Sequence, residues 1–264
     1  MTPIRVEDPD DPRVAGFRDV RERDLTGRRG LFVAEGAVVL RALVAPGSRC
    51  AVESVLVDER RVGALADVWS ALADCAPVHV AAQGVLDAVA GFHLHRGILA
   101  LGRVPPPVSL DEVAAPGPRT LLVAGGVGNH DNMGALMRNA AAFGVDAVVL
   151  DDRCCDPFYR KALRVAVGAT LSLPIVRAGG LDALLEELTR REVECLALSP
   201  AGRESLKDVR TAPRRAVVVG TEGPGLPPEI VARLRAVRID MRPGFDSLNV
   251  ATAAAIALHQ ITQP

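Results

Sequence analysis

Residues 120–144 have the sequence TLLVAGGVGNHDNMGALMRNAAAFG, and this stretch decides the fold class. The apolar run at 120–124 predicts a buried strand, which continues into a glycine turn and then into a helix predicted over 132–143. Gly144 follows at the position where a helix commonly ends in glycine. Unpaired N–H groups and the positive end of the helix dipole suit an anionic or polar ligand at such a turn. The stretch therefore predicts an α/β domain with a ligand site.

The same alternation of strands and helices extends to both sides. Further along the chain, the pattern predicts strands at 147–150, 194–198 and 216–219 and helices at 181–191 and 248–261. Before it, strands are predicted at 31–34, 52–57, 78–80 and 98–104, and helices at 37–44, 62–72 and 83–89. Strands joined by helices favour a parallel sheet. We predict an α/β protein in which a small α/β domain precedes a domain with a mainly parallel sheet.

Prolines separate the two predicted domains. Three consecutive prolines at 105–107 and the sequence APGP at 115–118 predict an extended, semi-stiff spacer over 105–118. The first domain is then predicted over 1–104 and the second over 119–264. Residues 1–30 mix Arg, Asp and Glu with little apolar periodicity, which predicts an arm or one short helix.

The composition is that of a globular protein. The chain has 264 residues, of which 49% are hydrophobic and 24% charged, with a formal net charge of -1. Six Phe, one Trp and one Tyr are too few for a site that stacks many bases. The five cysteines form no C-x-x-C pair or zinc-type cluster, which favours a reducing compartment and no metal. No signal peptide and no apolar run of about 20 residues is found, so we predict a cytoplasmic protein without a membrane segment.

The glycine turn at 125–128 also suggests a dinucleotide site. Asp151 and Asp152 end the next predicted strand, where an NAD-type fold keeps its ribose-binding acid. However, Asp131 occupies the third glycine position of the G-x-G-x-x-G fingerprint. A nicotinamide-dependent oxidoreductase therefore remains only an alternative.

Two further stretches have patterns that suit a ligand loop. Residues 216–227, AVVVGTEGPGLP, take a buried strand into three glycines and a lone Glu. Residues 239–258, IDMRPGFDSLNVATAAAIAL, take a Pro-Gly loop into an alanine-rich helix with Ser247 and Asn249 as candidate capping residues. Each stretch alone is explained as well by a turn or a helix cap.

The three stretches together resemble the SpoU (TrmH) family of SPOUT RNA methyltransferases. In order, N-x-x-N-x-G-x-x-x-R-x-x-x-x-F-G, G-x-E-G-x-G-L and I-x-M followed by S-L-N-V are similar to its motifs 1, 2 and 3. Residues 32–36, FVAEG, and 96–100, RGILA, resemble the start and end of the ribosomal-protein-L30e-like substrate-binding domain that is often fused to this enzyme. Two departures occur, Asp240 where the family usually has Pro and Ala251 where Ser is common.

The resemblance implies a fold, a cofactor and site residues. It implies a carboxyl-terminal trefoil knot that holds S-adenosylmethionine, and it assigns to this donor Gly220, Gly223, Ile239, Met241 and Leu248. To the catalytic site it assigns Asn132, Arg138, Glu222, Ser247 and Asn249. It also implies a homodimer, because the family builds its active site at a subunit interface.

The implied reaction is 2′-O-ribose methylation of structured RNA, with 23S ribosomal RNA favoured over transfer RNA. The reaction requires positioning and removal of one proton, without a metal or a covalent intermediate. Because a guanidinium has a pKa above about 12, we interpret Arg138 as a phosphate clamp and hydroxyl orienter rather than as the base. A non-catalytic RNA-binding module is the other alternative. Candidate RNA-binding residues are Arg21, Arg28, Arg29, Arg160 and Lys161.

Overall fold

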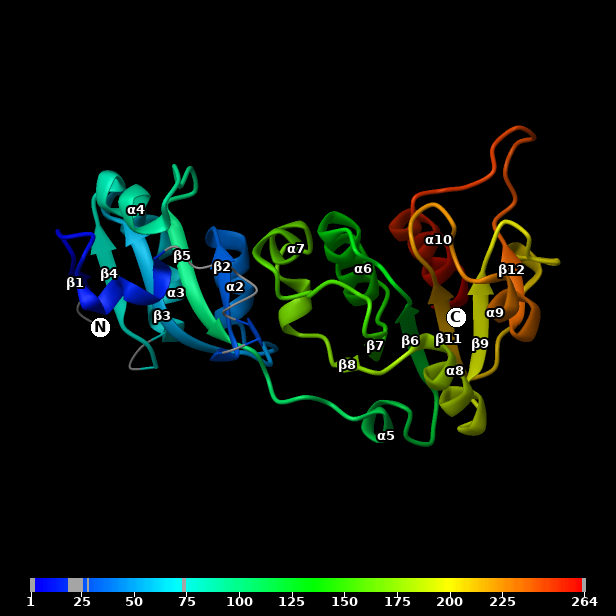
Figure 1. Ribbon diagram of the computed structural model, residues 1–264. Helices are drawn as coiled ribbons and strands as arrows, with labels where there is room; N and C mark the ends of the chain where they lie inside the picture. Colours follow the sequence, from blue (N-terminus) through cyan, green and yellow to red (C-terminus); the bar gives the residue numbers. More distant parts are fainter. Residues whose placement is uncertain (1–2, 19–25, 28, 73–74, 263–264) are drawn as a thin grey trace. The chain divides into compact units, whose positions relative to one another are not determined.

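The computed structural model describes residues 3–18, 26–27, 29–72 and 75–262. The chain forms two compact units (Figure 1). The first unit combines Met1–Pro105 with Pro157–Ser172, and the second combines Pro106–Asp156 with Leu173–Pro264.

The first unit is a five-stranded mixed sheet with helices around it. Its strands are, in spatial order, β1 (Ile4–Arg5), β4 (Val78–Ala81), β3 (Ala51–Asp58), β5 (Ile98–Arg103) and β2 (Leu31–Glu35). The first three are parallel to one another, whereas β5 is antiparallel to both β3 and β2. Its helices are α2 (Ala37–Val44), α3 (Ala66–Leu72) and α4 (Gln83–Ala90).

The amino-terminal segment, predicted as an arm or one short helix, adds a strand and a short helix to this core. β1 pairs with β4, and the 3₁₀ helix η1 (Pro12–Phe17) follows it. Val14 and Phe17 are buried in one cluster with apolar residues of α4 and the sheet. The Asp11 carboxylate starts η1 by accepting a 2.8 Å hydrogen bond from the Arg13 amide. Only a few apolar side chains make these contacts, so the segment lacks the apolar periodicity that would have predicted its burial in the core.

Residues 157–172, which the prediction assigned to the second domain, pack in the first unit. They form α7 (Arg160–Val165) and η3 (Ala169–Leu171). Arg160 donates a 2.7 Å hydrogen bond to the buried Glu35 carboxylate at the end of β2 and lies 4.7 Å from the Phe92 ring centroid. Arg164 and Arg96 lie 3.5 and 3.8 Å from the same carboxylate. A buried carboxylate requires such pairing, so Arg160 and Arg164 attach α7 to β2 of the first unit.

The second unit has a seven-stranded sheet in which all strands are parallel. The strands are, in spatial order, β10 (Glu204–Ser205), β12 (Arg235–Arg238), β9 (Glu194–Leu198), β11 (Arg214–Val219), β6 (Arg119–Ala124), β7 (Ala147–Leu150) and β8 (Ile175–Arg177). The apolar residues of the central strands are buried on both faces, as a sheet covered by helices on both sides requires. The predicted α/β class with a mainly parallel sheet is confirmed for this unit.

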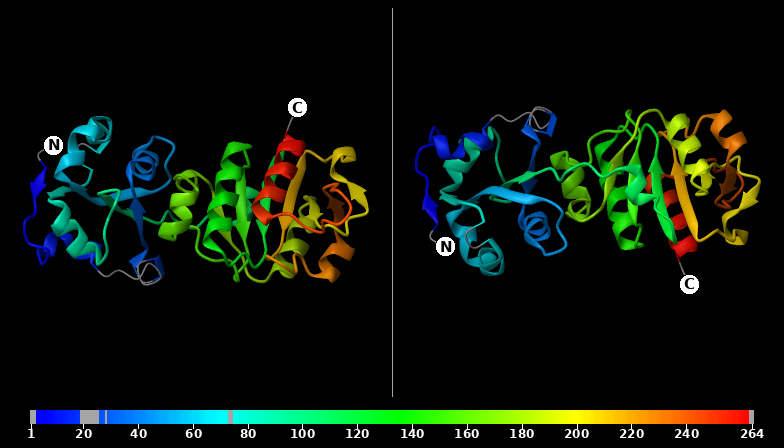
Figure 2. Two further views of the ribbon diagram at one scale, coloured as in Figure 1. Left: turned by 90° about the horizontal axis from the view of Figure 1, so that it is seen from above. Right: turned by 90° about the horizontal axis from the view of Figure 1, so that it is seen from below.

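Helices cover the two faces of this sheet in pairs. Figure 2 shows α6 (His130–Ala142) and α10 (Val250–Thr262) on one face and α8 (Leu181–Arg190) and α9 (Pro228–Arg233) on the other. α6 and α10 contact each other along their lengths, and Asn139 donates a 2.8 Å hydrogen bond to the carbonyl of Ala251. The second unit also includes part of the predicted spacer, because residues 110–113 form the short helix α5 (Leu110–Val113) and Val113 is buried in the core. A Ser109–Glu112 capping box starts this helix.

Candidate functional site

A pocket of about 570 Å³ lies in the second unit where three neighbouring strands end. Its wall includes the residues directly after β9, β11 and β12, namely Ser199, Gly220 and Ile239. The carboxyl ends of parallel strands meet at one edge of a sheet, which is where α/β proteins bind ligands. The volume is within the usual range for a small-molecule site.

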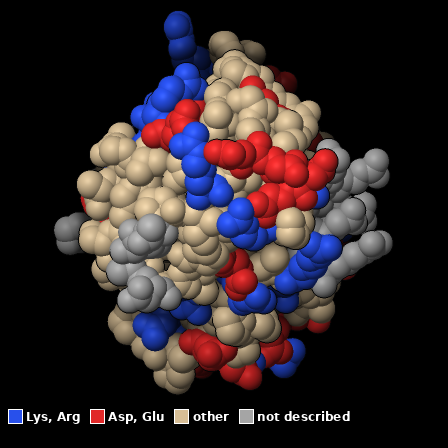
Figure 3. Space-filling view, turned by 90° about the vertical axis from the view of Figure 1, so that its left-hand side faces the viewer, with Lys and Arg blue, Asp and Glu red and all other residues tan. Residues whose placement is uncertain are grey.

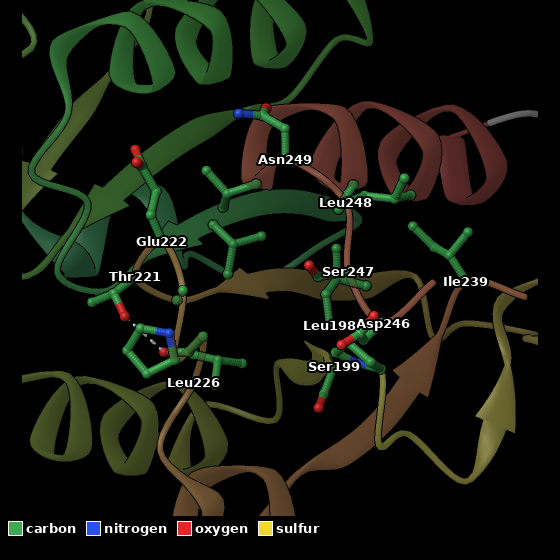
Figure 4. A pocket seen from close by; sticks show the side chains of 18 of the residues that line it. Leu198, Ser199, Thr221, Glu222, Leu226, Ile239, Asp246, Ser247, Leu248 and Asn249 are labelled. Carbon is green, nitrogen blue, oxygen red and sulfur yellow. Dashed lines mark hydrogen bonds between the residues drawn. The ribbon is translucent and has the colours of Figure 1, made fainter. Parts of the chain in front are cut away.

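The pocket joins an apolar wall to exposed backbone and two carboxylates. Figure 4 shows Leu248 and Ile239 on one side of the pocket, Thr221 and Leu226 on another, and Glu222 and Asn249 together at one end. The five residues assigned to the donor all line it: Gly220, Gly223, Ile239, Met241 and Leu248. Three of the five predicted catalytic residues do so as well: Glu222, Ser247 and Asn249.

A chain of hydrogen bonds joins the three motifs at one end of the pocket. The Asn249 amide donates a 2.8 Å hydrogen bond to the side-chain oxygen of Asn132, and the Asn132 amide donates to the Glu222 carboxylate. Asn249 is fixed in turn because its oxygen caps α10 by accepting from the Ala251 amide at 3.0 Å. The nearly buried Asn132 thus sets the position of a carboxylate at the pocket end. The helix cap is therefore Asn249, and not Ser247, which had been considered as a cap.

The loop between β12 and α10 is held mainly at its two ends. At its start, Asp240 accepts a 2.5 Å hydrogen bond from the Ser205 hydroxyl and lies 3.2 Å from Lys207 and 3.1 Å from Arg238. These partners, with Ser205 first, lower the pKa of Asp240. At its end, Asn249 caps α10. Asp240, at a departure from the family that the sequence resembles, therefore attaches one rim of the pocket to the neighbouring strand β10.

Residues 119–259 match the SpoU rRNA Methylase family. The chain belongs to this family. Uncharacterized tRNA/rRNA methyltransferases of Mycobacterium tuberculosis and Mycobacterium bovis are 42% and 41% identical over 270 and 269 residues, which is 97% of this chain and 90% of each relative. As a member of the SpoU family, the chain is an RNA methyltransferase.

Solved structures share the fold over almost the whole chain. A structure described as an RNA 2′-O ribose methyltransferase covers 97% of both chains with a TM-score of 0.80 at 24% identity. An AdoMet-bound rRNA methyltransferase from Sinorhizobium meliloti covers 97% of this chain and 96% of its own, with a TM-score of 0.78 at 22% identity. The agreement includes residues 1–105 of the first unit, which the SpoU family match does not cover.

The nicotinamide alternative is wrong for this SpoU protein. The Asp151 carboxylate, proposed as a ribose ligand, is fully buried and accepts a 2.8 Å hydrogen bond from the Gly126 amide. Its carboxylate therefore fixes the motif 1 turn.

Cys155 lies in the following loop, where burial raises the pKa of its thiol to about 11. A thiol of that pKa is protonated at neutral pH and is a poor nucleophile.

Arg138 lies away from the pocket of its own chain. It is exposed on α6, does not line the pocket, and has no ion pair or hydrogen bond with any residue that the structure describes. The structure therefore does not bring Arg138 together with the predicted catalytic residues that line the pocket of the same chain.

Three of the five candidate RNA-binding residues lie among the described residues. Arg21 and Arg28 lie outside the described residues, and Arg29 is exposed just before β2. Arg160 contacts Glu35, and Lys161 follows it on α7. On the face that Figure 3 shows, acidic and basic side chains are interleaved.

Sequence reasoning missed the part of the pocket after β9. Leu198, Ser199 and Pro200 line the pocket, and Asp246 adds a second carboxylate. The strand at 194–198 was predicted, so its carboxyl end could have been placed at the ligand edge by the rule used for the other strands.

Among the described residues, no group of three or more His, Cys, Asp or Glu could hold a metal ion. In the same part of the chain, no helix has both the length and the apolar character of a membrane span.

Proposed function

We propose that the chain transfers a methyl group from S-adenosylmethionine to a ribose 2′-hydroxyl of structured RNA, with ribosomal RNA rather than transfer RNA as substrate. The observation that supports this best is the carboxylate of Glu222, which Asn132 holds at one end of the pocket. A fixed carboxylate accepts a hydrogen bond from a hydroxyl and so can orient it for attack.

The pocket residues suit the donor. The apolar side chains of Leu198, Ile239 and Leu248 offer a surface for a flat base, and the glycines expose backbone groups. The carboxylates of Glu222 and Asp246 favour a ligand that has a positive charge. S-adenosylmethionine, when bound, supplies the methyl group from its positively charged sulfur. The assignment of Gly220, Gly223, Ile239, Met241 and Leu248 to the donor, and the trefoil knot around it, belong to this proposal.

The chain's own residues then act on the acceptor. As the new C–O bond forms and the C–S bond breaks, the 2′-hydroxyl gives up one proton, which leaves toward Glu222 or water. Ser247 and Asn249 border the same space and offer further hydrogen bonds. The protonated thiol of Cys155 argues against a covalent intermediate on sulfur.

We further propose a homodimer in which Arg138 acts on the partner's acceptor. Arg138 is exposed on α6, and the exposed side chain of Ile256 lies on the adjoining helix α10. The proposal also assigns to the first unit an L30e-like role in RNA binding. It further places the protein in the cytoplasm.

Methyl transfer tests this function directly. Protein, radiolabelled S-adenosylmethionine and RNA from cells that lack the protein are incubated, and the labelled nucleosides are identified by mass spectrometry. We expect 2′-O-methylnucleosides from ribosomal RNA, at least tenfold less product with Glu222→Gln, and full activity with the exposed control Glu229→Gln on α9. A methylated base would refute the assignment to the ribose. Label in transfer RNA would show that transfer RNA, and not ribosomal RNA, is the substrate. RNA binding without methyl transfer would favour the non-catalytic RNA-binding module.

Mixing two inactive variants tests the dimer. Arg138→Ala and Glu222→Gln each impair one half of the proposed site, so a mixed dimer retains one complete site. Activity that returns on mixing supports action across the interface. If the protein is a dimer but mixing restores nothing, Arg138 acts within its own chain.

A further inference from the structure

A second, smaller pocket lies on the other side of the motif 2 loop. It measures about 250 Å³ and shares with the first pocket Thr221, Pro224, Gly225 and Leu226. Its remaining wall is formed by Gly125 of motif 1, Leu181, Pro227 and Pro228, with Arg153 as its one charged residue. The loop that presents Glu222 therefore separates the proposed donor pocket from this second pocket.

The guanidinium of Arg153 is fixed by a buried carboxylate. Asp151 is fully buried, and its carboxylate accepts hydrogen bonds from the backbone amide of Arg153 at 3.2 Å and from its Nε at 3.3 Å. The side chain of Arg153 is nevertheless 62% exposed. Its two terminal nitrogens have no hydrogen-bond partner among the residues that the structure describes. Arg153 is thus held at Nε and directs its remaining donors toward solvent.

The motif 1 turn allows Arg153 and the motif 2 loop to approach each other. A Cβ at Gly126 would lie 2.6 Å from the Thr221 methyl carbon and 4.0 Å from the Arg153 guanidinium carbon, and Gly126 has a φ of +66°. Asp151 fixes this turn as well, through the Gly126 amide. One buried carboxylate therefore sets the position of both the turn and the arginine.

We propose that this second pocket binds a nucleotide of the RNA next to the acceptor, with its phosphate on Arg153 and its base against Leu181 and the prolines. The proposal rests on the proposed function, because it takes the polymer to be the acceptor. A guanidinium pairs with phosphate through two parallel hydrogen bonds, and an apolar wall suits the face of a base. Among the described residues that line this pocket none is a carboxylate, and the buried Asp151 contacts the Arg153 guanidinium only at Nε. Its shared wall with the loop of Glu222 puts it beside the proposed reaction site.

Substitution of Arg153 tests the proposal. With Arg153→Ala we expect the KM for ribosomal RNA to rise about tenfold, kcat at saturating RNA to stay within about twofold, and the Kd of S-adenosylmethionine to stay unchanged. The magnitude of the slope of log affinity against log salt concentration should fall by about one, which corresponds to the loss of one phosphate contact. Arg153→Lys should keep that slope, yet bind RNA several-fold more weakly, because an ammonium cannot form the planar pair. Arg190→Ala, an exposed arginine on α8 outside both pockets, is the matched control.

The outcomes are distinguishable. An unchanged salt slope with a lower melting temperature would overturn the proposal and leave Arg153 with a purely structural role. The second measurement is the binding of uridine 5′-monophosphate to the wild-type protein and to Arg153→Ala. If the substitution abolishes binding of this nucleotide but leaves the affinity for RNA intact, the pocket serves a free nucleotide and the proposal is wrong. The salt slope is a binding measurement, so it decides the question even if no methyl transfer is found and the proposed function fails.

Discussion

Replacing Gly220 by alanine should displace the motif 2 loop. A Cβ at this position would lie 2.3 Å from the carbonyl carbon of Gly225 and 2.4 Å from the backbone nitrogen of Leu226. Carbon atoms in van der Waals contact are about 3.5–4.0 Å apart, so the loop backbone has to move by about 1 Å or more. No flexible side chain can yield instead, because the atoms in the way are backbone atoms.

The structure also indicates the size of the effect. The loop is closed by two backbone hydrogen bonds of 3.2 Å between Thr221 and Gly225, and by a 3.1 Å bond from the Thr221 hydroxyl to the Gly225 carbonyl. Overpacking of this kind costs about 1–3 kcal/mol. The middle of the loop is exposed, so it can move without opening the core, and most of the cost should appear in donor binding. The Kd of S-adenosylmethionine should therefore rise by about 5- to 150-fold.

Calorimetric titration and urea unfolding of Gly220→Ala measure the two parts of this cost. Gly179→Ala is the control, because a Cβ at that exposed position meets nothing within 4 Å. Gly223→Ala is a useful comparison, because its φ of +83° adds backbone strain of about 1–2 kcal/mol in open space. A Kd within twofold of wild type for folded Gly220→Ala would refute the argument that this loop forms the donor wall.

Further predictions concern thiols, the pocket rim and the motif contact. Iodoacetamide at pH 7.5 should label the exposed Cys75 before the other four cysteines. Burial raises the pKa of those four thiols to about 11 or 12, and they are Cys50, Cys154, Cys155 and Cys195. Equal labelling of all five cysteines in a mass spectrum would contradict this prediction. Asp240→Asn should reduce unfolding stability at pH 7. Because folding lowers the pKa of Asp240, the difference from wild type should shrink in urea titrations as the pH falls below about 4. Asn132→Ala removes two hydrogen bonds and should lower the unfolding free energy by about 1–3 kcal/mol. It should also lower kcat at least tenfold, because Glu222 is then no longer held in place. A normal kcat in a methyl-transfer assay would show that the position of Glu222 is unimportant.

The buried parallel strands could be predicted because each is a short apolar run. β7 and β9 occur at the predicted residues, because both are apolar apart from Glu194 at the start of β9, as coverage on both faces requires. β12 was missed, because Arg235 and Arg238 interrupt its apolar pattern. The reason is tertiary: Arg235 forms 2.6 Å hydrogen bonds with both Glu194 and Glu204, which raise the pKa of Arg235. Such partners, distant in sequence, make an arginine acceptable in a strand that periodicity cannot recognise.

The motifs predicted residues that do line one pocket, whereas the contacts that fix these residues could not be predicted. The pocket wall that we propose for the donor consists of loops that directly follow parallel strands, so motifs 2 and 3 each indicate their own place at the sheet edge. The acceptor side depends on contacts between residues far apart in the chain, such as Asn132 with Glu222, and on a buried group whose role was mistaken. Asp151 has the place of a ribose ligand in the sequence, yet its burial makes it a support for Arg153. A carboxylate after a strand therefore indicates a ligand only when it is exposed, and when it is buried the residue that it holds is the better candidate.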